Sequence, residues 1–124
     1  MALSIDTSGS VYNRAEEIVG QGRAMLESGI IGELVIIACD SRAHLIGRFS
    51  RGDEIIIPEI PGGGGTSFKP PFEMLDELGI VPTCHAYLTD LQGDFPDQDP
   101  GYPVLWCTTM PGVAPFGTVI DMAY

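Results

Sequence analysis

The chain has 124 residues, the length of one domain built around a single hydrophobic core. Its 44% hydrophobic content is that of a globular protein, and it contains no apolar run near the roughly 20 residues that span a bilayer. Seventeen acidic and six basic residues give a net charge of −11, which disfavours binding to nucleic-acid phosphates.

The three cysteines, Cys39, Cys84 and Cys107, lie in or beside apolar strand-like runs. An odd number of cysteines does not form a disulfide framework, so we expect buried free thiols in a reducing compartment. The first residues have neither the charged nor the long apolar region of a targeting sequence. We therefore expect a cytoplasmic protein.

The first predicted strand ends in a cluster of oxygen-bearing side chains. The apolar run 3–5 leads into Asp6, and Ser8 and Ser10 follow in the pattern D-x-S-x-S. Asp6 then stands at the carboxyl end of the strand, with the two serines on the turn into the next helix. Hard cations such as Mg²⁺ are held by oxygen ligands of this kind. The alternative is an ordinary strand–turn–helix in which Ser10 caps the helix.

A helix over 11–28 and a strand over 33–40 follow. The glycines at 20 and 22 each cost a helix interior about 1 kcal/mol relative to alanine, which indicates close packing against a sheet. Ser28-Gly29 is a helix stop. The strand is apolar without alternation, as in a parallel sheet covered on both faces, and it ends at Asp40.

The middle of the chain contains two strand-like runs, a segment rich in proline and glycine, and a short predicted helix. Residues 43–50 and 53–57 predict either a hairpin or an antiparallel edge. Two prolines and four glycines then lead to Thr66 and Ser67. A short helix is predicted over 72–79.

The last third contains two more strands and a terminal short one, predicted over 84–90, 103–108 and 118–122. The first of these ends at Asp90, and Trp106 is predicted to lie in the core. The stretch 91–102 is acidic and rich in turn residues; we interpret it either as a solvated turn or as a surface that steers a basic partner. Its side chains of interest are Asp94, Phe95, Asp97, Asp99 and Tyr102.

Strands alternating with helices predict an α/β fold with a Rossmann-like, mostly parallel sheet, an antiparallel edge and few flanking helices, in a single domain over 1–124. Three strands end in aspartate, at Asp6, Asp40 and Asp90. Ligand sites of open α/β sheets lie at the carboxyl ends of strands, where the strand order reverses. This geometry brings Asp6 and Asp90 together, although aspartate also favours turns.

Three segments together resemble a known metal site. Asp6-Thr7-Ser8-Gly9-Ser10, Gly64-Gly65-Thr66 and Leu88-Thr89-Asp90 are similar to the metal-ion-dependent adhesion site (MIDAS) of von Willebrand factor type A (VWA) domains. More narrowly, the chain resembles the VWA-like domain at the C-terminus of bacterial metallopeptidase-like proteins. GGGGTSFKPPFE, YLTDLQGDFP, YPVLW and APFG also recur there.

The resemblance implies a set of metal ligands for Mg²⁺ or Mn²⁺. Asp6, Ser8 and Ser10 would form the first ligand loop, Thr66 the second and Asp90 the third; Thr66 could instead be a turn residue. The residues expected to surround these ligands are Asp40, Ser67 and Asp94. Ser67 replaces an acid that is frequent in the subfamily, so any charge contributed at that position is missing here.

The resemblance further implies a binding module without enzymatic activity, in which an Asp or Glu of a partner protein completes the coordination of the metal. VWA proteins of bacteria often act as adaptors beside AAA+ ATPases, so such an ATPase or a metallopeptidase-like companion is an expected partner. The chain has no H-E-x-x-H motif, and His44 and His85 lack the spacing of zinc ligands. We expect both histidines to be structural or exposed.

Two alternatives remain. The first is a small Mg²⁺-dependent phosphatase with Asp6 as nucleophile. Ser8 stands where such enzymes have a second acid, and Lys69 is the only lysine. The second is a VWA scaffold that binds no metal.

The number of predicted helices is low for a sheet that is apolar on both faces. Such a sheet needs cover on each side, and only two helices are predicted. Either loops such as 41–61 and 109–117 pack onto the sheet, or apolar surface remains for another subunit or domain. We therefore expect self-association or a bound partner.

Overall fold

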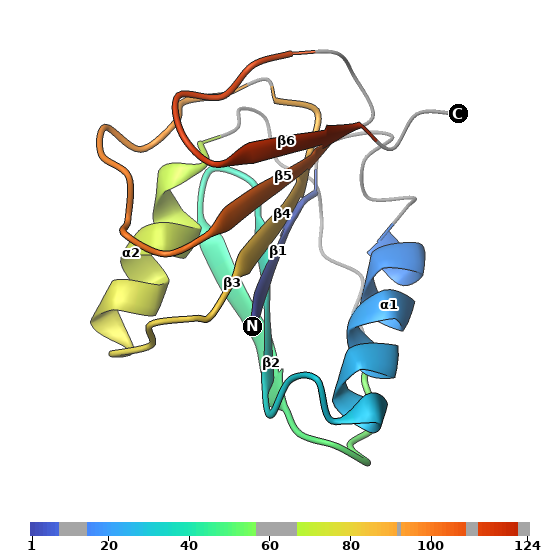
Figure 1. Cartoon of the computed structure of the whole chain (residues 1–124). Helices are drawn as coiled ribbons and strands as arrows, with labels where there is room; N and C mark the ends of the chain where they lie inside the picture. Colours follow the sequence, from blue (N-terminus) through green and yellow to red (C-terminus); the bar gives the residue numbers. More distant parts are fainter. Residues whose placement is uncertain (8–14, 57–66, 92, 109–111, 122–124) are drawn as a thin grey trace.

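The computed structural model describes residues 1–7, 15–56, 67–91, 93–108 and 112–121. In these residues it contains one sheet of six strands and two helices (Figure 1). In chain order they are β1 (Ala2–Asp6), α1 (Ala15–Ser28), β2 (Leu34–Cys39), β3 (Ala43–Phe49), α2 (Lys69–Glu77), β4 (His85–Thr89), β5 (Val104–Thr108) and β6 (Thr118–Asp121).

The strand order in the sheet is β3-β2-β1-β4-β5-β6. Every neighbouring pair is parallel except β2 and β3, which run antiparallel with a bulge between Ile36 and Ile37. The predicted α/β fold with an antiparallel edge is confirmed. The hairpin alternative is wrong for the residues that are described, because 53–56 form no strand. From β1 the chain adds strands on one side and then, starting with β4, on the other, so the order reverses between β1 and β4.

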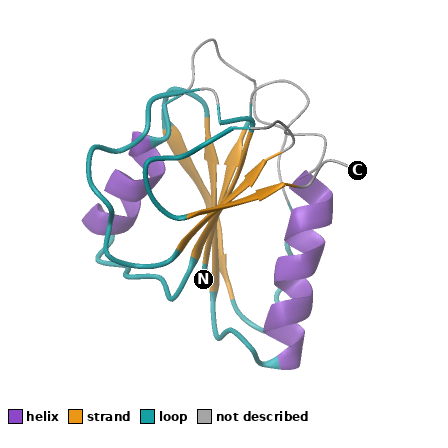
Figure 2. Ribbon diagram, turned by 45° about the horizontal axis from the view of Figure 1, so that its top comes forward, coloured by secondary structure: helices purple, strands orange, loops and turns teal. Residues whose placement is uncertain are grey.

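The two helices cover opposite faces of the sheet (Figures 1 and 2). Because side chains alternate along a strand, Leu3 and Ile5 of β1 pack on the face of α1, where Val19 and Leu26 of that helix also lie. Ala2 packs on the opposite face in a cluster with other buried aliphatic residues, Val35, Ile37 and Leu75. All residues of β1 and β2 are buried. This double cover explains why both runs are apolar without alternation.

Aromatic rings fill the α2 face over β4 and β5. The ring of Trp106 lies 5.6 Å from that of Phe68 and 5.2 Å from that of Tyr87, measured between centroids. All three side chains are fully buried, and the indole Nε1–H donates a hydrogen bond to the carbonyl of Phe116 at 2.9 Å. The prediction that Trp106 belongs to the core is confirmed. Fully burying each such side chain contributes on the order of 1.5–3 kcal/mol of hydrophobic stabilisation.

The ends of the helices follow the local sequence. The predicted stop of α1 is confirmed: Gly29 has a φ of 81°, and the Ile30 N–H bonds to the carbonyl of Met25 at 3.1 Å. Residues 11–14 of the predicted first helix lie outside the described residues. Helix α2 begins at Lys69, three residues earlier than predicted, because prolines at the first helical positions need no N–H partner.

The two glycines of α1 have different surroundings. A Cβ on Gly22 would stand 2.8 Å from Cδ2 of Leu34, so α1 packs closely against β2 at this point, as predicted. A Cβ on Gly20 would meet nothing within 4 Å. The prediction of close packing is therefore wrong for Gly20.

Candidate functional site at the carboxyl edge of the sheet

Asp6 and Asp90 stand at the carboxyl ends of two neighbouring parallel strands. Asp6 is the last residue of β1 and is fully buried, whereas Asp90 directly follows β4 and is half-buried. Ile5 pairs with Leu88 across the two strands, which places both strand ends at one level of the sheet. This is also the point where the strand order reverses, the usual position of ligand sites in open α/β sheets.

Thr89 connects the two strand ends. Its hydroxyl donates to Oδ2 of Asp6 at 3.4 Å and accepts the backbone N–H of Leu91 at 3.0 Å. The second bond closes a turn around Asp90, so one buried side chain contacts the first acid and fixes the backbone at the second. Thr89 was not among the predicted site residues, although a hydroxyl at the end of a largely apolar strand was a visible signal.

Leu91 adopts an uncommon backbone conformation beside Asp90. Its φ is 64°, in a region that residues other than glycine rarely occupy. A Cβ on Gly112 would lie 2.9 Å from the Leu91 Cδ1, so the leucine side chain packs closely against this glycine. Such a conformation costs of order 1–3 kcal/mol and persists where the surroundings hold it. The backbone that follows Asp90 is therefore held in place by packing.

Asp40 follows β2 at the same edge, and its carboxylate is engaged in its own turn. Oδ1 accepts the backbone N–H of Arg42 at 2.8 Å and lies 3.5 Å from Nε2 of His44. The hydrogen bond from Arg42 lowers the pKa of Asp40, and His44 contributes in the same direction. Asp40 is thus held as a carboxylate next to the site.

Ser67 and Asp94 bring two more segments to this edge. The backbone N–H of Ser67 bonds to the carbonyl of Asp40 at 3.3 Å, and that of Phe68 bonds to the carbonyl of Asp94 at 2.9 Å. Ser67 and Asp94 form an isolated parallel bridge. The start of α2 is therefore joined both to the end of β2 and to the loop that follows β4.

Two weakly acidic groups lie on the α2 side, beside Asp6. Cys39 is the residue paired with Asp6 across β1 and β2, and its thiol lies 3.2 Å from the carbonyl oxygen of Ser67. Burial raises the pKa of Cys39 to about 11, and the charges of Asp6 and Asp40 add to this shift. Burial also raises the pKa of Tyr87, which shares the aromatic cluster with Cys39. Both groups stay protonated at neutral pH, so Asp6 has neutral neighbours here.

Three of the five predicted ligands, Ser8, Ser10 and Thr66, lie outside the described residues. In the part of the chain that is described, no group of three or more histidine, cysteine, aspartate or glutamate side chains is placed to hold a metal. The oxygen atoms of Asp6 and Asp90 are the donor type that a hard divalent cation prefers. Two carboxylates at adjacent strand ends therefore fit the charge and chemistry of Mg²⁺ or Mn²⁺.

The two histidines have structural positions. His85 is fully buried in β4, and its Nε2 forms a hydrogen bond of 2.6 Å with Oγ of Ser4. Burial lowers the pKa of His85 to about 3, so the ring is neutral at physiological pH. His44 is exposed and contacts Asp40. Both placements agree with the prediction that the histidines are structural or exposed.

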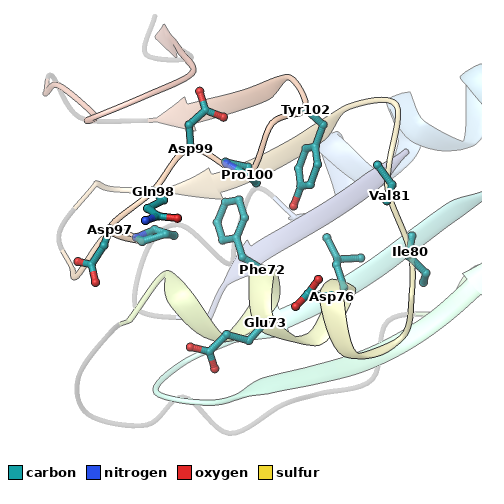
Figure 3. Close-up of a pocket in the computed structure, with 12 residues that line it drawn as sticks. Phe72, Glu73, Asp76, Ile80, Val81, Asp97, Gln98, Asp99, Pro100 and Tyr102 are labelled. Atoms are coloured by element: carbon teal, nitrogen blue, oxygen red, sulfur yellow. The ribbon is translucent and has the colours of Figure 1, made fainter.

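The acidic stretch after β4 packs against α2 and borders a cavity of about 630 Å³ (Figure 3). Phe72 and Tyr102 form aromatic walls, and burial together with the negative charge of Asp76 raises the pKa of Tyr102 to about 12. Asp97 and Asp99 are exposed on the rim. The stretch is thus more than a solvated turn, because Phe95 and Tyr102 pack into the aromatic cluster. Its carboxylates disfavour anionic ligands.

Comparison with known families adds one finding. The sequence profile of the VWA-like domain (DUF2201) matches residues 1–123. The chain belongs to this family. No curated protein and no solved structure is significantly similar to this VWA-like domain. Within its described residues, neither helix has the length and apolar character needed to cross a bilayer.

Proposed function

We propose that this VWA-like domain is a binding module without enzymatic activity, whose sheet edge holds Mg²⁺ or Mn²⁺ and engages a carboxylate of a partner protein. The observation that carries the proposal is the placement of Asp6 and Asp90 at the ends of adjacent parallel strands, joined through Thr89. Chain segments more than 80 residues apart meet there.

The burial of Asp6 supports the proposal in energetic terms. A carboxylate removed from water loses its hydration, and a cation beside it offsets that cost. Asp6 and Asp90 would supply the negative charge, and the hydroxyls of Ser8, Ser10 and Thr66 would bind without adding any. A metal held in this way keeps enough positive charge to attract an Asp or Glu side chain from outside.

The residues near Asp6 in the sequence argue against a phosphatase. Ser8 stands where such enzymes have a second acid, and Lys69 is the only lysine that could neutralise a phosphate. The binding module is therefore the better interpretation. The adaptor role beside an AAA+ ATPase or a metallopeptidase-like companion, in the bacterial cytoplasm, belongs to the same proposal and follows from the family resemblance.

The direct test is titration calorimetry of the chain with MnCl₂ and MgCl₂. We expect saturable binding that weakens at least about tenfold, or roughly 1.4 kcal/mol, in Asp6→Asn and in Asp90→Asn. Asp97→Asn is the matched control, because it removes the same charge from an exposed position on another part of the surface. Thermal melts of all variants separate a lost ligand from a lost fold.

Two outcomes would contradict the proposal. Absence of saturable heat in the folded wild-type chain would favour a scaffold that binds no metal. Metal-dependent turnover of a generic phosphate ester that Asp6→Asn abolishes would favour the phosphatase.

A further inference from the structure

The α1 face of the sheet is only half covered by the described residues. Helix α1 packs over β1 and β2, where Val19 and Leu26 meet Leu34 and Ile36. The connections before and after β5 instead contribute their rings to the opposite face, through Phe95, Tyr102 and Phe116. Among the described segments, none of these connections covers the α1 side of β4, β5 and β6.

A cavity of about 620 Å³ occupies this uncovered half, alongside α1. We call it the α1 groove. Its floor is formed by Ala86, Leu105 and Ile120, one from each of the three strands, and Ile18 and Met25 of α1 form a wall. Ile120 is 39% exposed, and Leu105 is half-buried although it lies in an interior strand. Apolar surface of this kind marks a binding site rather than ordinary solvent-facing surface.

The α1 groove has a direction. Glu17, in the first turn of α1, lies at the end of the groove that corresponds to the carboxyl edge of the sheet. Asp121, the last residue of β6, also borders this end, although its side chain alternates to the α2 side, as that of Val119 does. The opposite end is lined by Ile30, Thr83 and Cys84 and by Met1, whose N-terminal ammonium donates to the carbonyl of Glu33 at 3.0 Å. One end therefore carries an acidic side chain, whereas the other carries none.

We propose that the α1 groove binds an amphipathic helix of a partner protein, oriented like α1, with basic residues in its first turn. A helix is the natural cover for the face of a parallel sheet, and α1 already supplies the neighbouring ridge. The positive end of the helix and its basic side chains would lie beside Glu17. A second copy of this chain is a poor occupant, because each copy carries a net charge of −11.

This inference goes beyond the proposed metal site and does not depend on it. The floor residues Ala86, Leu105 and Ile120 belong to the α1 side of the sheet, whereas Asp6 and Thr89 alternate to the α2 side, as Ala2 and Tyr87 of the same strands do. Binding in the groove should therefore be unchanged by EDTA or by Asp6→Asn. A failure of either proposal leaves the other standing.

The test uses two synthetic peptides of identical composition. Each has about 14 residues, the length of α1, with a leucine and alanine stripe at helical spacing and glutamine elsewhere. One carries three lysines in its first turn, and the other carries them in its last turn. The readouts are fluorescence anisotropy of the labelled peptide and the rate at which Ellman's reagent modifies Cys84, the most exposed of the three thiols, which lines the groove.

We expect the peptide with lysines in its first turn to bind more tightly and to slow the modification of Cys84. Ile120→Lys, on the floor of the groove, should weaken this peptide about tenfold. Val113→Lys should have little effect, because it adds the same charge at an 87% exposed position outside the groove. Both substitutions are at exposed positions, and circular dichroism melts confirm folding.

Four results would overturn the inference. The first is an unprotected Cys84, and the second is equal weakening by the two lysine variants. The third is equal binding of the two peptides, which would refute the orientation. The fourth is a wild-type dimer in sedimentation velocity that Ile120→Lys dissociates, because the occupant would then be a second copy of the chain.

Discussion

The two faces of the sheet use the same strands for different purposes. On the α2 side, the side chains of β4 and β5 are His85, Tyr87, Val104 and Trp106, and rings from the connecting segments complete a closed aromatic layer. On the α1 side, the same two strands present small or aliphatic residues and leave a groove. The closed face therefore stabilises the fold, and Asp6 lies at its carboxyl edge, whereas the other face is the one on which we propose that a partner binds.

The strongest test of this difference truncates one side chain on each face of β5. Trp106→Ala should lower the free energy of unfolding by about 3–5 kcal/mol, because a fully buried ring with five aromatic neighbours is lost. Leu105→Ala, the next residue on the α1 face, is half-buried and should cost about 1 kcal/mol. Urea unfolding measures both. Equal losses would mean that the two faces contribute alike.

Low pH should destabilise the protein through His85, which is buried on the closed face. Its folded pKa of about 3 lies below the ordinary value of 6.5, so the unfolded chain binds more protons between these two values. The contribution of neutral His85 to the free energy of unfolding is therefore complete above pH 6.5. It decreases as the pH falls toward 3, by an amount on the order of a few kcal/mol. His85→Gln should flatten this dependence, whereas His44→Gln, at an exposed residue, should not. Parallel pH profiles for wild type and His85→Gln would contradict the assignment.

Substitutions of Thr89 test whether a side chain on the closed face also positions the proposed metal ligands. If Asp6 holds a metal, Thr89→Val should weaken Mn²⁺ binding about tenfold, because the hydroxyl that contacts Asp6 and fixes the turn at Asp90 is removed. Thr89→Ser keeps the hydroxyl and should restore affinity. Calorimetry measures the effect, and a melt of the metal-free protein separates it from stability. Unchanged affinity in Thr89→Val, with a wild type that binds Mn²⁺, would assign Thr89 a purely structural role.

The smallest expected effects on stability come from substituting the two glycines of α1. Gly20→Ala should raise the free energy of unfolding by about 0.5–1 kcal/mol, since it improves helix propensity where a Cβ meets nothing. Gly22→Ala should be about 1 kcal/mol less favourable than Gly20→Ala, because its Cβ presses on the buried Leu34. Thermal melts compare the two variants. An equal gain at both positions would show that α1 can shift on the sheet far enough to accept a Cβ at residue 22.

Much of the fold followed from local patterns. Unbroken apolar runs predicted the central parallel strands, and Ser28-Gly29 predicted the end of α1, since burial on both faces and a left-handed glycine leave direct marks in the residues concerned. Residues 53–56 of the strand expected after Arg51 form no strand, although the outer edge of β3 is free of any described strand, because Ile55 is buried in the core with Val19 and Leu26 of α1. The start of α2 was misplaced because prolines read as breakers also fit a first helical turn.

The candidate site, too, was predictable from the sequence only in part. The sequence alone determined that Asp6, Asp40 and Asp90 stand at or directly after the ends of strands, because each acid closes a largely apolar run. Only the tertiary structure decided that β1 and β4 are neighbours, that Thr89 contacts Asp6, and that the connections around β5 close one face and leave the α1 groove on the other. These features depend on contacts between residues far apart in the chain. Local propensity and side-chain alternation carry no information about such contacts.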